Sequence, residues 1–102
     1  MPAEERRFEI EVGEGAWIHA RVRRDPEKGL DWAAVLTVER DDALVPVCVY
    51  DNAHGVPERH RIRGGIKLPA EPWPSRGSAN LDMPAAIAEI KADWEGMVER
   101  WL

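Results

Sequence analysis

Two segments near the N-terminus alternate apolar and polar residues on either side of a Gly-Glu-Gly turn. Alternation with a period of two is typical of β-strands that bury one face. If the chain turns at Glu14, Phe8 lies opposite Ala20 on the apolar face. The same register sets Glu9 opposite His19 on the other face, where opposite charges are favourable. The sequence therefore predicts an N-terminal β-hairpin.

Two further strands are predicted at about residues 31–40 and 43–50, joined by a two-residue turn of aspartates. A regular hairpin with this turn sets Leu36 opposite Val47 in the core. Asp51 would then continue on the core side, and its neighbours Tyr50 and Asn52 would point the other way. An aspartate at the inner rim of a sheet suggests a special role for this strand end.

The middle of the chain contains residues that interrupt strands. Pro46 cannot donate to a β-ladder, so its strand lies at an edge or its nitrogen faces no partner. A short fifth strand is predicted near residues 60–66, broken by two glycines. Three prolines then exclude regular structure from residue 69 to about residue 80, and Trp73 is expected to anchor that loop.

The C-terminal segment has the spacing of an amphipathic helix. Asp82 is the predicted N-cap and Pro84 falls in the first turn. Six apolar residues recur at steps of three and four and predict a face that covers the sheet. They are Ile87, Ile90, Trp94, Met97, Val98 and Trp101. We therefore expect an α+β fold, with an antiparallel sheet of four to five strands and one long C-terminal helix packed across one face.

Length and composition limit the class of protein. A chain of 102 residues predicts a single domain over residues 1–102. Its net charge of −5 argues against nonspecific coating of nucleic acid. Cys48 is the only cysteine, and there is neither an apolar leader nor a membrane-length apolar run. A cytoplasmic protein without a membrane partner is expected.

The segment YDNAHGVPERHR, residues 50–61, concentrates groups that can do chemistry. Asp51, His54 and His60 are the candidate catalytic residues, because imidazole and carboxylate exchange protons near neutral pH. The same three residue types can ligate zinc or another first-row metal, although their spacing matches no established metal signature. The third interpretation is a loop in which Asp51 and Asn52 bind their own backbone. No cofactor is predicted.

Two arginines follow this cluster in a locally basic segment. Arg59 and Arg61 are the candidate phosphate contacts, and Asn52 is a third candidate substrate-binding residue. On a regular strand His60 would face one way and both arginines the other, so one site could not easily use all of them. Trp17 is a separate candidate, because it is expected among cations on the outer face of the first hairpin.

The same stretch resembles the TumE-like toxin family of bacterial toxin–antitoxin systems. The resemblance is carried by the step Tyr50-Asp51-Asn52, by His54, Pro57 and His60, and by the C-terminal ADWEGMVERWL, and it covers about residues 45–102. Glu58 stands where many such sequences have a further histidine, which puts a site that uses that imidazole in doubt.

The resemblance implies a growth-inhibiting toxin that acts on RNA and has an antitoxin protein as its partner. A small ribonuclease is the enzyme class that fits this implication. The alternative is a non-catalytic interaction module that forms a homodimer or binds a partner through an exposed edge strand or the Trp17 face.

Overall fold

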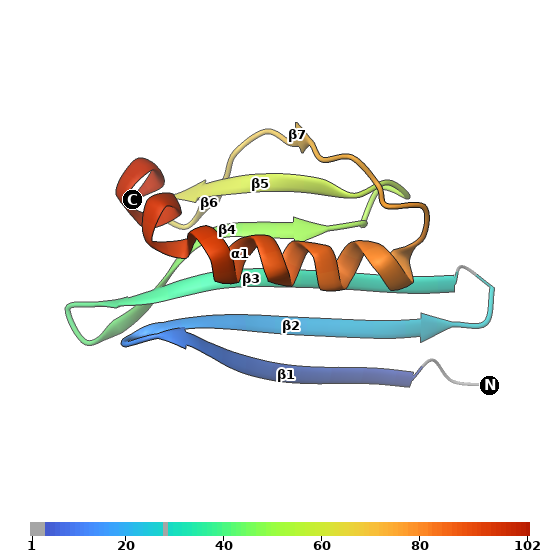
Figure 1. Cartoon of the computed structure of the whole chain (residues 1–102), viewed down its shortest axis with the longest axis horizontal. Coiled ribbons are helices and arrows are strands. Elements are labelled where there is room, and N and C mark those ends of the chain that lie inside the picture. Colours follow the sequence, from blue (N-terminus) through green and yellow to red (C-terminus); the bar gives the residue numbers. More distant parts are fainter. Residues whose placement is uncertain (1–3, 28) are drawn as a thin grey trace.

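The computed structural model describes residues 4–27 and 29–102, which form an antiparallel sheet with one long helix packed on it (Figure 1). The elements are β1 (Glu4–Gly13), β2 (Ala16–Asp25), β3 (Gly29–Arg40), β4 (Ala43–Asp51), β5 (Glu58–Arg63), β6 (Ile66–Lys67), β7 (Glu71–Pro72) and α1 (Ala79–Trp101). Lys28, in the predicted turn between β2 and β3, lies outside the described residues.

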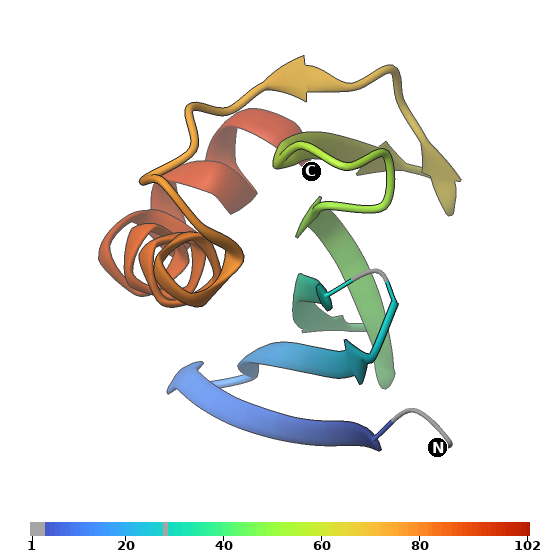
Figure 2. The same ribbon diagram turned by 90° about the vertical axis from the view of Figure 1, so that its right-hand side faces the viewer.

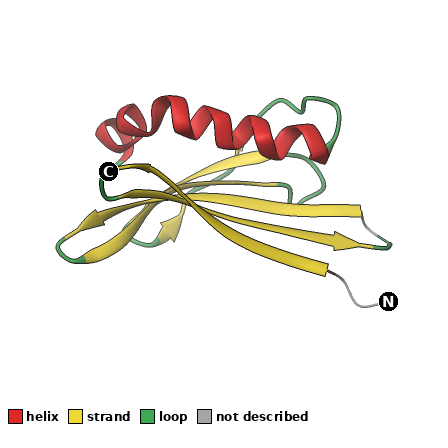
Figure 3. Cartoon of the chain, turned by 60° about the horizontal axis from the view of Figure 1, so that its bottom comes forward, coloured by secondary structure: helices red, strands yellow, loops and turns green. Residues whose placement is uncertain are grey.

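The strands lie side by side in sequence order from β1 to β6, and β7 also pairs with β5. This confirms the predicted α+β class and the C-terminal helix on one face of the sheet (Figure 3). Among the described residues the sheet has seven strands instead of four to five. The difference arises because the chain after the two glycines pairs with β5 twice, first as β6 and then as β7.

The first hairpin has the predicted register. Phe8 pairs with Ala20 on the apolar face, and Glu9 pairs with His19 on the other face. Gly15 closes the turn with φ of 70°, a conformation that side chains with a Cβ rarely adopt. Short-range alternation was therefore sufficient to fix this pairing.

The predicted register between β3 and β4 is correct only next to their turn. Val38 pairs with Val45, but Leu36 pairs with Cys48 instead of the predicted Val47. Val47 is the extra residue of a β-bulge, where two residues of one strand oppose one residue of the other. The bulge shifts every later pair of the two strands by one residue.

This shift reverses the predicted orientation of the end of β4. Tyr50 pairs with Ala34 and is fully buried on the inner face, which we define as the face that α1 covers. Asp51 pairs with Ala33 and therefore lies on the outer face. The predictions that Asp51 faces the core and that Tyr50 points away from it are both wrong.

Pro46 has the second of its two predicted explanations. It pairs with Thr37 of β3 and lies outside the segment Cys48–Asp51 that pairs with β5. The missing N–H therefore interrupts no ladder between β4 and β5. β4 itself is an inner strand of the sheet, between β3 and β5.

The helix begins earlier than predicted. Ser78 is its N-cap residue, and Asp82 lies in the first turn instead of at the cap. Buried Asp82 accepts hydrogen bonds from Ser75 Oγ at 2.8 Å and from the Arg76 backbone N–H at 2.5 Å. It therefore fixes the loop that leads into the helix. The prediction that Asp82 is the N-cap is therefore wrong, because its carboxylate binds the loop before the helix while Ser78 occupies the N-cap position.

The core lies between α1 and the inner face of the sheet, and α1 packs mainly against β3 (Figure 1). Trp32 and Ile90 are fully buried there, and Ile90 belongs to the helix face that the apolar periodicity predicts to cover the sheet. Trp73 anchors the loop before the helix as predicted, with its ring edge-to-face with Tyr50 at 5.5 Å between centroids. None of the described residues forms a helix both long and apolar enough to cross a membrane.

Candidate metal centre

A cluster of two carboxylates and one imidazole lies on the outer face where β4 ends and β5 begins. The strand register sets Asp51 directly opposite Glu58, and His60 follows Glu58 on the same face. One potential ligand atom from each of the three residues lies within 4.8 Å of those of the other two. We call these three residues the carboxylate–histidine cluster. Its existence depends on the bulge at Val47, which turns Asp51 toward the outer face.

His60 has one nitrogen committed and one unpaired. Its Nδ1 lies 2.8 Å from the carbonyl oxygen of Leu68. A carbonyl can only accept, so Nδ1 carries the proton and donates it. The other nitrogen, Nε2, is buried and has no hydrogen-bond partner among the described residues. The lone pair of this buried Nε2 is thus available to a ligand, and one ring nitrogen of His60 lies within 4.8 Å of a carboxylate oxygen of Asp51 and of Glu58.

Asp51 is only 4% exposed and is held at both oxygens. Its Oδ1 accepts from the Ala53 backbone N–H at 3.1 Å, which is the predicted binding of the loop to its own backbone. Its Oδ2 lies 3.0 Å from Nζ of Lys67 on β6. One cation therefore already faces a carboxylate of the cluster, and it comes from a side chain that is about half exposed.

His54 lies one hydrogen bond away from the cluster. Its Nδ1 lies 2.7 Å from Oε1 of Glu58, while 71% of its side chain is exposed. Glu58, considered a departure from the family pattern in the sequence, is therefore the residue that connects His54 to Asp51 and His60. One feature of the sequence could have identified Glu58 as part of the site. Asp51 and Glu58 flank one short loop, so the two residues face each other across a hairpin.

Asn52 and the two arginines lie elsewhere. Asn52 joins the end of β4 to β3, because its Oδ1 accepts from the Trp32 N–H at 2.9 Å and its Nδ2 donates to the Leu30 carbonyl at 2.8 Å. Arg59 and Arg61 pair with Tyr50 and Cys48, on the inner face. The predicted separation of His60 from both arginines by strand alternation is confirmed.

The arginines bind acidic side chains of this protein. Arg59 Nη2 lies 2.7 Å and Arg61 Nε 2.8 Å from the two carboxylate oxygens of Glu71. The hydrogen bond from Arg59 holds the pKa of the Glu71 carboxyl below its usual range. The Cζ atom of Arg59 also lies over the ring of Trp101, 5.0 Å from the ring centroid. Neither guanidinium can therefore contact a phosphate bound at the cluster without first leaving these partners.

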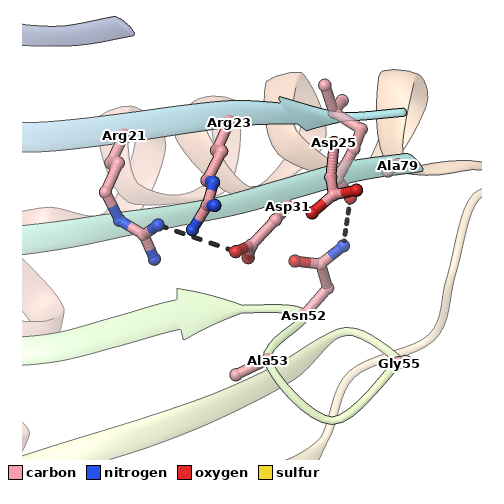
Figure 4. Close-up of a pocket in the computed structure, with 9 residues that line it drawn as sticks. Arg21, Arg23, Asp25, Asp31, Asn52, Ala53, Gly55 and Ala79 are labelled. Carbon is pink, nitrogen blue, oxygen red and sulfur yellow. Dashed lines mark hydrogen bonds and ion pairs between the residues drawn. The ribbon is translucent and has the colours of Figure 1, made fainter. Parts of the chain in front are cut away.

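A pocket of about 550 Å³ opens beside the loop that follows Asp51 (Figure 4). Arg21 and Arg23 of β2 point into it from one side, and Asn52 and Ala53 line the opposite side. Arg21 Nη1 lies 3.7 Å from an oxygen of Asp31, so the pocket wall carries both signs of charge. Sequence reasoning missed this pocket, since it combines residues from three separate strand ends.

Comparisons with protein-family models, curated proteins and solved structures found no match for this chain. The geometry of its own residues is therefore the basis for any functional proposal, and the resemblance to the TumE-like family stays a prediction.

Proposed function

We propose that the protein binds a divalent transition-metal ion, such as Zn²⁺, through Asp51, Glu58 and His60. The observation that carries the proposal is the unpaired, buried Nε2 of His60. Buried polar atoms are nearly always paired, so an unpaired imidazole nitrogen in a cluster with two carboxylates is a suitable position for a bound cation. A metal-binding histidine commonly donates its other N–H to a carbonyl or carboxylate, and the Leu68 carbonyl occupies that position here.

Nitrogen from one imidazole and oxygen from two carboxylates are suitable ligands for zinc and its first-row neighbours. Two carboxylates in one cluster also favour a dication electrostatically. Three protein ligands leave a coordination position for water, as in catalytic zinc sites, where the bound water becomes a nucleophile near neutral pH. The donor set therefore supports hydrolytic chemistry better than a purely structural site with four protein ligands.

Metal binding is tested by calorimetric titration of chelator-treated protein with Zn²⁺. We expect one ion per chain. His60→Gln should lower the Zn²⁺ affinity by about 100-fold or more, because removing a ligand should cost more affinity than removing a residue that only supports a ligand, which typically costs about 10–100-fold. His19→Gln is the matched control, because His19 lies on the same face and is held by Glu9 and Thr37. Equal affinity in folded His60→Gln and wild-type protein would refute the proposal.

Lys67 gives a second, independent test. Its ammonium group lies 3.0 Å from Asp51 Oδ2 and competes with any metal cation for that carboxylate. Lys67→Met should therefore raise Zn²⁺ affinity while lowering the stability of the metal-free protein, because the buried carboxylate of Asp51 then loses its cation. A stability loss without any gain in affinity would indicate that the cluster is only an internal ion-pair network.

The toxin-like role with RNA as target remains a prediction of the family resemblance, and it rests on the same cluster. Arg23 at the neighbouring pocket is a better candidate for phosphate contact than Arg59 and Arg61, whose guanidinium groups bind Glu71. Arg21 lines the same pocket but already lies 3.7 Å from Asp31 and 3.8 Å from Glu5. Expression of the chain alone should slow bacterial growth, and His60→Ala should relieve the effect. Undiminished toxicity in folded His60→Ala and His54→Ala would remove both residues from the mechanism.

A further inference from the structure

The segment that follows the two glycines holds both faces of β5. We call residues 66–72, which comprise β6, β7 and the residues between them, the clasp. Lys67 of the clasp pairs with Ile62 of β5, and Glu71 pairs with Arg59. Between these two pairs, three residues of the clasp face two residues of β5, which is a β-bulge. The extra residue puts Lys67 on the outer face and Glu71 on the inner face. Figure 2 shows the clasp, in yellow to gold, passing from the side of the sheet away from α1 to the side of α1.

The bulge brings the backbone of Leu68 to His60. The Leu68 N–H donates to the carbonyl of Arg61 at 2.8 Å, and the Leu68 carbonyl accepts from Nδ1 of His60 at 2.8 Å. The second hydrogen bond holds the imidazole proton on Nδ1 and leaves the lone pair on the buried Nε2. Bulges next to functional sites often redirect a group in this way. The clasp therefore determines which nitrogen of His60 is free to ligate a metal ion.

One carboxylate anchors the clasp on the inner face. The two oxygens of Glu71 lie 2.7 Å from Arg59 Nη2 and 2.8 Å from Arg61 Nε. The side chains of Glu71 and Arg59 are only 32% and 26% exposed, so salt screens their ion pair less than it screens a fully exposed one. The two arginines are the residues directly before and after His60 in β5. Glu71 therefore binds the strand on both sides of the proposed metal ligand.

We propose that Glu71 is a positioning residue for the metal centre and acts on it from the opposite face of the sheet, through the clasp. The inference rests on the proposed metal binding and adds a control of that site. While Glu71 binds both arginines, the clasp stays on β5 and Leu68 keeps its hydrogen bond to His60. When the clasp detaches, the proton is no longer confined to Nδ1. A fraction of the molecules then carries it on Nε2, which cannot ligate a metal in that form.

The coupling between the clasp and the metal is reciprocal. If attachment of the clasp raises the Zn²⁺ affinity by some factor, bound Zn²⁺ favours attachment by the same factor. Zn²⁺ should therefore slow hydrogen exchange of the Leu68 amide, whose N–H binds the Arg61 carbonyl. Amides of the β1–β2 hairpin, at the other side of the sheet, serve as the internal reference and should be slowed less.

The positioning role is tested first without metal. NMR chemical shifts of the ring nitrogens report the tautomer of His60 at a pH where the imidazole is neutral. Wild-type protein should carry the proton on Nδ1, and Glu71→Ala should give a mixture of both tautomers. Glu89→Gln is the matched control, because Glu89 lies 3.9 Å from the same Arg59 guanidinium but belongs to α1. An unchanged tautomer in folded Glu71→Ala would overturn the positioning role and leave metal binding itself untouched.

The effect on Zn²⁺ affinity is measured in the Lys67→Met background, because the clasp also carries the ammonium group that competes for Asp51. There Glu71→Ala should lower the affinity by up to about tenfold, the low end of the range for residues that support a ligand. Equal affinity with and without Glu71, or a Leu68 amide that Zn²⁺ does not slow, would also contradict the proposal. Failure of the metal site itself is recognised separately, since wild-type protein then binds no Zn²⁺ while the tautomer of His60 is still measurable.

Discussion

Gly13→Ala is expected to destabilise the protein because of one aromatic ring. Gly13 does not have a positive φ, so its backbone tolerates alanine. An added Cβ, however, would lie 2.3 Å from Cζ2 of Trp94 and 2.9 Å from Cε2 of the same ring. Both distances are far below van der Waals contact. The ring or the end of β1 must therefore move, and Trp94 packs against the core.

The magnitude follows from two opposing effects. Forcing an additional methyl group into a packed site costs about 1–3 kcal/mol. Replacing glycine by alanine stabilises by roughly 0.4–1 kcal/mol through the unfolded chain. A net loss of about 1–2 kcal/mol remains, which lowers the melting temperature of a domain of this size by about 5–15 °C.

The assay is urea and thermal unfolding of Gly13→Ala, Trp94→Leu and the double variant. Without the indole ring, Gly13→Ala should be neutral or stabilising by up to about 1 kcal/mol. The two substitutions should therefore show a coupling of about 1–2 kcal/mol in a double-mutant cycle. The reasoning is refuted if Gly13→Ala stabilises the wild-type background, or if its effect is the same with and without Trp94.

Two further predictions concern titrating groups. Burial raises the pKa of the Cys48 thiol to about 12, so iodoacetamide should modify it only when the chain unfolds, and fast labelling of native protein would contradict this burial. The hydrogen bond from Arg59 lowers the pKa of Glu71 in the folded state, so its contribution to stability is present above the unfolded-state pKa and is lost as the pH falls through the folded-state value. Glu71→Gln should therefore flatten the acid side of the curve of unfolding free energy against pH, and Glu95→Gln, at an exposed helix position, should not.

Local sequence patterns predicted which segments form strands and the helix better than they predicted the register in which the strands pair. The hairpin of β1 and β2 could be paired correctly because Phe8 and Ala20 lie close to a tight turn in strands that alternate regularly. The pairing of β3 with β4 failed at Val47, since a bulge adds one residue without leaving a gap in the apolar pattern. Pro46, next to the bulge, was the sequence signal of an irregular strand.

The candidate site was also predictable only in part, because residue types can be read from the sequence but the pairing of β4 with β5 cannot. Asp51 and His60 were selected by residue type, and the structure brings them together. Glu58 was missed because its role depends on lying opposite Asp51, which is a property of the hairpin and not of a motif. The unpaired Nε2 of His60 was not predictable at all, since it depends on the Leu68 carbonyl from a later segment binding the other nitrogen.

The order of the elements has a consequence for the synthesis of the protein. Neighbouring strands from β1 to β6 are also neighbours in sequence, so each can pair as soon as the next one leaves the ribosome. The helix that covers their apolar face comes last. During translation the sheet therefore exposes the fully buried side chains of Trp32 and Leu36 until α1 is complete. The nascent chain is most prone to aggregation in this interval, when a chaperone would have its greatest effect.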